Sequence, residues 1–152
     1  MAWQLAQLNV AHSLTDLDDP VMTEFVAALD VVNAGAEASP GFVWRLETPE
    51  GDTTAVRLFG DERWLVNLSV WDSVEALLAF VRSGDHLAIM RRRGEWFARL
   101  DEAHLVLWWV PAGHRPTLQE AAARLGRLRR EGPGAEAFDF RSPFGPPAED
   151  GG

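Results

Sequence analysis

Two ionisable side chains stand in a segment that otherwise has the spacing of an apolar helix face. His86 and Arg93 lie seven residues apart, so on a helix they project along the middle of the face that Ile89, Met90 and Trp96 help to define. A buried arginine or histidine needs a partner. One interpretation is structural, with a hydrogen-bonded core histidine and an arginine paired with a carboxylate. The other is a ligand pocket in which His86 acts as acid or base and Arg93 binds an anionic group.

Amide and hydroxyl side chains also occupy positions at which an apolar residue is expected, namely Asn9, Asn33, Asn67 and Ser69. Asn33 lies on the apolar stripe of a predicted helix, and the other three share predicted strand faces with apolar residues. Each of them either ties a loop or a strand edge together or contacts a ligand. Taken together, they would supply the convergent polar groups of a small-molecule site.

An aromatic cleft would complete such a site, and the chain has seven tryptophans and eight phenylalanines for it. We assign catalytic or orienting roles to His86, Arg93, Asn9 and Asn67. The side chains expected to line the ligand are Asn33, Trp44, Ser69, Trp71, Met90 and Trp96.

Several kinds of chemistry are excluded by composition. The 152 residues contain no cysteine and no tyrosine, and all 14 basic residues are arginine. This composition excludes thiolate metal sites, cysteine nucleophiles, a lysine Schiff base and the lysine of a phosphate-binding loop. The four histidines lack metal-ligand spacing, and no serine stands in a nucleophile-elbow motif. We expect no metal site.

The charge balance limits the partners. A formal net charge of −9 argues against nucleic acid, which requires a basic face. The run Arg91-Arg92-Arg93 is the exception, and its place near a helix C-terminus explains most of it. No apolar stretch approaches the roughly 20 residues of a membrane span, and the first residues do not resemble a signal peptide. We therefore expect a cytoplasmic protein without a membrane partner.

Hydrophobic periodicity and cap residues predict the elements that must position these side chains. Strands are expected at 3–12, 42–47, 64–71 and 104–110, with a short strand-like stretch at 55–59. A first helix is expected to begin at 20 and to end before residues 39–41. A second is expected to begin at 73 and run to about 82, and after a break at 83–85 to continue to about 97. A third is expected from 118 to about 130. Residues 49–52 are expected to form a turn.

The predicted order is β-α-β-β-α-β, the ferredoxin-like pattern of the α+β class, with a third helix appended. We expect one domain over residues 1–141 and a flexible tail over 142–152. Helices on one face of an antiparallel sheet would leave its other face uncovered. Because many strand residues are tryptophans, we expect a homodimer that closes sheet against sheet.

Five segments carry a resemblance to a known family: 5–9, 39–46, 67–71, 91–97 with its arginine run and Trp96-Phe97, and 107–114. On these the chain resembles, over nearly its whole length, a bacterial family of unknown function in the dimeric α/β-barrel superfamily. The strand end at Trp71 and the helix after it are more distantly similar to antibiotic-biosynthesis monooxygenases and to haem-degrading monooxygenases. This resemblance implies a cleft between helices and sheet in each subunit.

The two monooxygenase branches imply different chemistry. The haem-degrading branch uses a strand asparagine, which Asn9 matches, a helical tryptophan, which Phe80 replaces, and an axial histidine. Met90 stands at the position of that histidine, and His86 lies one turn earlier. The cofactor-independent branch needs an apolar cleft with an amide and an ordered water, which Asn9, Asn67 and Trp71 would suit.

We therefore expect a protein that binds a small aromatic or polycyclic ligand between helices and sheet, as a cofactor-independent monooxygenase-like or cyclase-like enzyme if it is catalytic. Two alternatives stay open. One is a haem-binding protein with His86 as the ligand. The other is a non-catalytic dimeric structural or interaction module whose tryptophans pack an interface.

Overall fold

The sheet is built from the four strands that the sequence predicts. The computed structural model describes residues 2–48 and 52–147 of the chain. Its strands are β1 (Trp3–His12), β2 (Phe42–Arg45), β3 (Trp64–Trp71) and β4 (Leu105–Pro111). They form one antiparallel sheet in the order β2-β3-β1-β4. The strand predicted at 42–47 ends earlier, at Arg45, and the other three lie within one residue of their predicted bounds.

The helices begin in three cases where the cap residues predict, at Pro20, Val74 and Leu118. They are the 3-10 helix η1 (Pro20–Met22), α1 (Thr23–Glu37), α2 (Thr54–Phe59), α3 (Val74–Val81), α4 (Gly84–Arg91), α5 (Arg93–Trp96) and α6 (Leu118–Glu131). In three of them a side-chain oxygen accepts a hydrogen bond from a backbone N–H of the first turn. These oxygens belong to Asp19, Ser73 and Thr117. The order of elements confirms the α+β ferredoxin-like fold with an appended helix.

One predicted strand is wrong. Residues 55–59 lie in α2, which starts where the Asp52 carboxylate accepts hydrogen bonds from the Thr54 N–H at 2.8 Å and the Thr54 hydroxyl at 2.6 Å. The helix ends at Gly60, whose φ of 112° is a left-handed conformation suited to glycine. An apolar run this short has too few residues for its periodicity to distinguish a strand from a helix. The hydrogen bonds at the start of α2 therefore show what the sequence pattern does not.

A second correction concerns the predicted helix from 84 to 97, which is interrupted. At the end of α4 the Arg92 N–H bonds to the Ile89 carbonyl at 3.0 Å, and α5 begins at Arg93. The Arg92 guanidinium pairs with Glu24 and Glu95, which fixes the chain at this turn. The prediction that His86 and Arg93 share one continuous helix face is therefore wrong.

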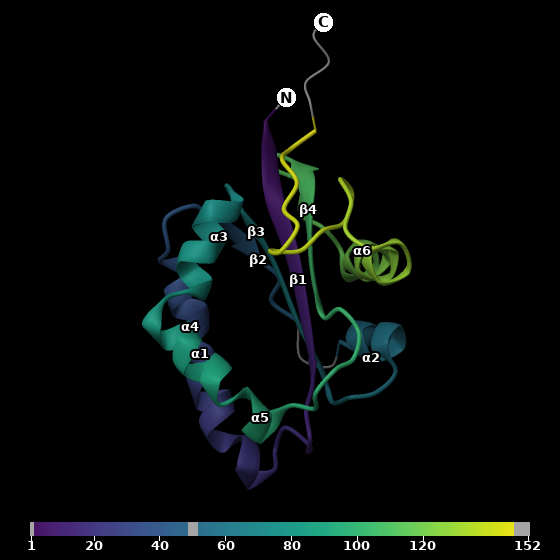
Figure 1. Ribbon diagram of the computed structural model, residues 1–152. Helices are drawn as coiled ribbons and strands as arrows, with labels where there is room; N and C mark the ends of the chain where they lie inside the picture. Colours follow the sequence, from purple (N-terminus) through teal and green to yellow (C-terminus); the bar gives the residue numbers. More distant parts are fainter. Residues whose placement is uncertain (1, 49–51, 148–152) are drawn as a thin grey trace, which may run out of the picture.

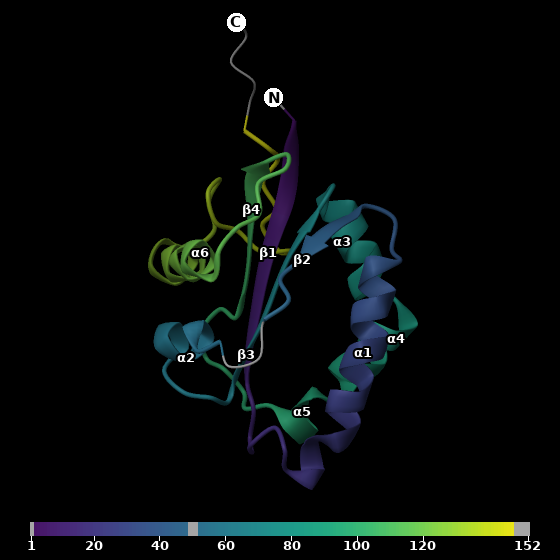
Figure 2. The same ribbon diagram turned by 180° about the vertical axis from the view of Figure 1, so that it is seen from behind.

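Helices cover both faces of the sheet, as Figures 1 and 2 show. On one side lie α1, α3, α4 and α5, and on the other lie α2 and α6. The α6 residues predicted to be buried are buried, and they pack in one cluster with the sheet: Leu118, Ala121, Leu125 and Leu128. The sheet residues of that cluster are Ala6, Leu8, Val10, Leu68, Val70, Val106, Trp108 and Val110.

The expectation of an uncovered second sheet face is therefore wrong. The sheet side chains of this α6-facing cluster are at most 2% exposed, because the chain's own α6 and α2 lie over them. A homodimer that closes sheet against sheet has no free apolar sheet face for that contact in the described part of the chain. The physical reason is that α6 is not a peripheral addition but the second covering layer of the sheet.

The residues after α6 return to the sheet. Phe138 exchanges backbone hydrogen bonds with Leu107 at the outer edge of β4, and its side chain is buried. The Trp109 indole N–H donates to the Phe144 carbonyl at 2.8 Å. The turn predicted at 49–52 and the last part of the predicted tail, 148–152, lie largely outside the described residues. Within the described ranges, no helix combines the length and apolarity that a membrane crossing requires.

Candidate functional site

A row of polar side chains crosses the middle of the sheet on the face that α1 and α3 cover. Asn9 pairs in register with Asn67, and Gln7 pairs with Ser69, on the neighbouring strands β1 and β3. Side chains two residues apart on a strand share a face, so all four lie on the same side. Leu5 continues this face and packs in a cluster with Ala36 of α1 and Leu77 of α3. We call Asn9, Asn67, Gln7 and Ser69 the polar row.

Hydrogen bonds join most of the polar row to the neighbouring tryptophan. Gln7 Nε2 lies 2.5 Å from Asn67 Oδ1 and 2.7 Å from Ser69 Oγ. The Trp71 indole Nε1 donates to the same Ser69 Oγ at 2.9 Å. Gln7 and Ser69 are buried, and Trp71 is 1% exposed. Buried polar groups in such a network hold each other in one arrangement.

An aromatic column leads from this network to the helices. The Trp71 ring lies 5.4 Å from Phe42 in an edge contact and 5.4 Å from Phe80 in a stacked contact, measured between ring centroids. Phe80 lies 5.3 Å from the His86 ring, again edge-on. The polar row, Trp71, Phe80 and His86 thus form one continuous set of contacts, although α4 supplies only its last member.

His86 is the titratable member of this set. Its Nδ1 atom is buried and has no hydrogen-bond partner among the described residues. Burial lowers the pKa of His86, and the main chain of Val81 opposes this shift to a smaller degree. The imidazole is therefore neutral near pH 7, the form in which one ring nitrogen can accept a proton.

The polar row reaches the surface at one end. Asn67 is exposed and Asn9 is half-buried, whereas Gln7 and Ser69 beside them are buried. The helical layer therefore leaves Asn67 accessible although it lies in the middle of a central strand.

Other predicted site residues lie elsewhere. Trp44 pairs with Val70 and packs with the cluster on the α6 side, and its ring lies 5.9 Å from the Arg115 guanidinium. Trp96 is buried in a separate cluster with Met22 and Phe25. The structure thus does not bring these two tryptophans to the polar row.

Arg93, Met90 and Asn33 are not joined to the row by any hydrogen bond among the described residues. All three are half-buried. Arg93 lies near His104, whose pKa is lowered mainly by burial and further by the Arg93 charge. Arg93, predicted to lie on the same helix face as His86, is thus a neighbour of His104.

Sequence reasoning gave no role to Gln7 and Phe80. Gln7 is the donor that connects the two strands of the row, and Phe80 connects Trp71 to His86. The available signal for Gln7 was its period-2 position with Asn9 and Leu5. Only the register of β1 against β3 shows that it faces Ser69.

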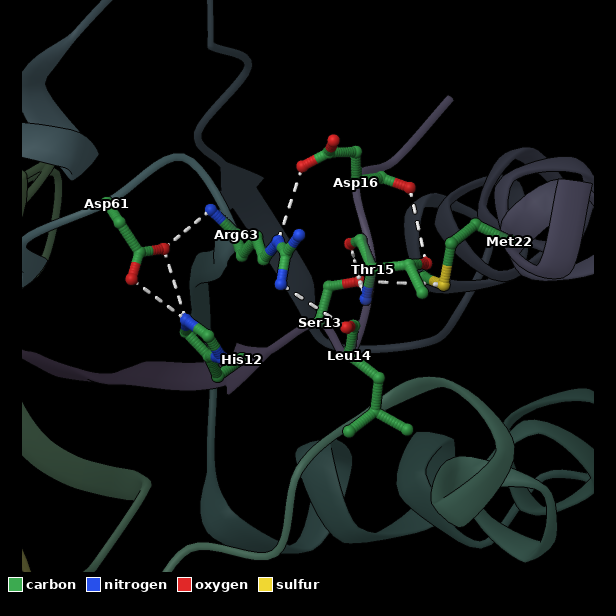
Figure 3. Close-up of polar contacts among 8 residues, drawn as sticks. All are labelled: His12, Ser13, Leu14, Thr15, Asp16, Met22, Asp61 and Arg63. Atoms are coloured by element: carbon green, nitrogen blue, oxygen red, sulfur yellow. Dashed lines mark hydrogen bonds and ion pairs between the residues drawn. The ribbon is translucent and has the colours of Figure 1, made fainter. Parts of the chain in front are cut away.

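The far end of β1 carries a second polar cluster beside an open hollow of about 450 Å³ (Figure 3). His12 Nε2 lies 2.9 and 3.1 Å from the two Asp61 carboxylate oxygens, and Arg63 Nε lies 3.3 Å from Asp16 Oδ1. Hydrogen bonds from His12 and from the Arg63 N–H lower the pKa of Asp61. These contacts join the loop after β1 to the loop before β3.

A further hollow of about 330 Å³ lies at the end of α6, between Arg127 and Ala137. Neither hollow includes a residue of the polar row. Across the described ranges, no group of three or more histidine, aspartate or glutamate side chains is arranged to hold a metal ion. The polar row with Trp71 is the place where the largest number of the predicted site residues meet.

Comparison with solved structures gives likenesses at low identity. SnoaB, a cofactor-independent oxygenase from Streptomyces nogalater, is 18% identical with a TM-score of 0.48, over 78% of this chain and 100% of SnoaB. A conserved protein from Methanosarcina mazei is 11% identical with a TM-score of 0.50, over 70% and 90% of the two chains. Rv0793 from Mycobacterium tuberculosis is 16% identical with a TM-score of 0.48, over 75% and 99%. At such identities the likeness concerns the fold alone.

Comparison at the sequence level gives the family. No curated protein matches the chain. A family model described as a domain of unknown function, DUF3291, matches residues 4–151. Because this match spans nearly the whole chain, the protein belongs to the DUF3291 family.

Proposed function

We propose that the protein binds a small aromatic or polycyclic ligand against the polar row, with Trp71 beside it. The observation that carries this proposal is the exposure of Asn67 on a central strand, next to buried polar neighbours. Ligand sites combine an apolar wall with a few fixed polar groups, and the row and the aromatic column supply both. Asn9, opposite Asn67, is the second amide that the ligand would meet.

The same residues suit the monooxygenase-like chemistry that the sequence resemblance implies. Deprotonation of a phenol or of a carbon next to a carbonyl creates an oxyanion, and fixed amide and hydroxyl donors stabilise such a charge. His86, which contacts Trp71 through Phe80, is neutral and is the group of this set that can accept a proton. The proposal requires no metal and no bound cofactor. Arg93 has no role in it, because no hydrogen bond among the described residues joins Arg93 to the row.

The haem alternative has less support than this one. His86 packs edge-on against Phe80, and the two hollows described above lie away from it. We expect that titration with haem produces no Soret shift that depends on His86. A shift that His86→Ala abolishes would favour the haem alternative over the proposal.

We expect Asn67→Ala to weaken binding of an aromatic ketone about fivefold, the effect of losing one neutral hydrogen bond. The probe is 2-acetylnaphthalene, and calorimetry measures its Kd. Asn67→Ala removes one acceptor of the buried Gln7 amide but leaves the main-chain carbonyl at 3.3 Å, so we expect the free energy of unfolding to fall by about 1 kcal/mol or less.

Gln4→Ala is the matched control, since it too truncates an amide side chain on a central strand, here β1. Gln4 accepts a hydrogen bond from the Gly113 N–H, outside the polar row. The control should bind the ketone like the parent. Equal weakening in both variants, or no binding by the parent to 2-acetylnaphthalene and larger aromatic ketones, contradicts the proposed site. Oxygen uptake with hydroxylated members of the same series then separates a catalyst from a binding protein.

A further inference from the structure

The direction of the hydrogen bonds in the polar row can be worked out from its two ends. At one end, Gln7 Nε2 lies 3.3 Å from the main-chain carbonyl of Asn67, which can only accept. At the other end, the Trp71 indole N–H can only donate, and it donates to Ser69 Oγ. Because a carbonyl only accepts, the contact with Asn67 requires the nitrogen of the Gln7 amide, and not its oxygen, on the side that faces Asn67 and Ser69.

This direction fixes the exposed amide of Asn67. Gln7 Nε2 carries two protons, which it directs to Asn67 and to Ser69. The Asn67 Oδ1 atom is held at 2.5 Å from that nitrogen, so the Asn67 Nδ2 group is turned away from Gln7. Asn67 is exposed, and no described residue accepts its Nδ2 protons, which are therefore available to a ligand bound at the row.

The same argument applies to Ser69. Its oxygen accepts from Gln7 at 2.7 Å and from Trp71 at 2.9 Å, which uses both lone pairs. The hydroxyl proton is left to donate, and no described residue accepts it. Asn67 and Ser69, two residues apart on one face of β3, thus both keep a donor, of which the Asn67 group is the exposed one.

We propose that Gln7 is a positioning residue that sets the polarity of the site, holding Asn67 and Ser69 as hydrogen-bond donors. The preferred ligand then carries an acceptor oxygen, as a carbonyl or a phenolate, where it meets the row. The choice of ligand rests on the proposed function, whereas the polarity set by Gln7 is a property of the ligand-free protein.

Gln7→Glu reverses the polarity without changing the shape of the side chain. An ionised carboxylate only accepts, so Asn67 must turn its Nδ2 group toward it and present Oδ1 outward, and Ser69 must donate its proton to it. The measurement is hydrogen exchange of the Asn67 side-chain amide by NMR, at a pH where the 13C shift of the introduced carboxyl shows it to be ionised. We expect exchange of these protons at least tenfold slower than in the parent. Unchanged exchange overturns the proposal.

The second measurement compares the affinities of two ligands of matched shape. The ratio of these affinities would not change if Gln7 had only a structural role. We expect the parent to bind 2-acetylnaphthalene five- to tenfold more tightly than 2-isopropylnaphthalene, which has nearly the same shape and no acceptor. In Gln7→Glu this preference should vanish or reverse, while the affinity for the hydrocarbon changes little.

Gln4→Glu is the control, because it places the same charge on the same strand outside the row. The control should keep the ketone preference of the parent. Loss of the preference in both variants, or its persistence in Gln7→Glu, contradicts the role of Gln7. If the parent binds neither ligand, the proposed function fails, and the exchange of the Asn67 amide still decides the polarity.

Discussion

Ser69→Ala is expected to lower the free energy of unfolding by about 2–3 kcal/mol, far more than a hydroxyl deletion at a surface. The change leaves the Trp71 indole N–H and one proton of Gln7 without an acceptor. Both donors are buried, so neither is fully rehydrated, and an unsatisfied buried donor costs about 1–3 kcal/mol. Urea denaturation monitored by tryptophan fluorescence measures the difference.

A double-mutant cycle tests whether this cost comes from the network. Trp71→Phe removes the indole donor, so Ser69→Ala should be cheaper in that background, by about 1 kcal/mol. Ser83→Ala is the matched control, because the Ser83 side chain forms no cap hydrogen bond at the start of α4. Strict additivity of Ser69→Ala and Trp71→Phe, or an equal cost at Ser83, would show that the network does not stabilise the sheet as described.

His86→Phe is expected to stabilise the protein by about 1 kcal/mol at pH 8, and by more at pH 5. The part that does not depend on pH comes from removing a buried Nδ1 atom that has no hydrogen-bond partner among the described residues. The position lies beside Phe80 and so suits an apolar ring. The pH-dependent part follows from the lowered pKa of His86. Below the unfolded pKa of about 6.5, the unfolded chain binds a proton that folded His86 does not, so the parent loses stability as pH falls toward the lowered pKa.

His86→Gln separates the two parts of this effect. Glutamine does not titrate but keeps polar atoms, so this variant should lose the pH-dependent part and keep most of the constant cost. Thermal unfolding of the three proteins between pH 5 and 8 is the measurement. If the stability difference between the parent and His86→Phe is the same across that range, or larger at pH 8, the lowered pKa of His86 is refuted.

Local signals in the sequence are sufficient to locate the four strands of the sheet and the starts of α3 and α6. Period-2 alternation located β1 and β3, and the capping residues Ser73 and Thr117 located the starts of α3 and α6. These features depend on residues close together in the chain, which is why a single sequence suffices. The placement of Asn9, Asn67 and Ser69 on one side of their strands follows from the same alternation.

Long-range packing accounts for what was missed. The spacing of apolar residues predicts the amphipathic face of α6. No pattern within that segment indicates that this face lies over the sheet face opposite α1 and α3. Trp44 lies on that α6 side because the pairing of β2 with β3 is irregular between Phe42 and Trp44, and no local pattern in the sequence marked this irregularity. Arg93 is not on the helix face of His86 because α4 ends at Arg91 and α5 begins at Arg93, with Arg92 at the turn paired to Glu24 of α1.

The measurement that tests the central claim most directly is a titration of the 15N-labelled protein with 2-acetylnaphthalene, observing the seven tryptophan indole N–H signals. Trp71 borders the polar row, whereas the Trp108 indole N–H bonds to Glu120 on the α6 side. Binding at the proposed site shifts the Trp71 signal in a saturable way and leaves that of Trp108 unchanged. A saturable shift of Trp108 with Trp71 unaffected would place the ligand on the other side of the sheet and contradict the account.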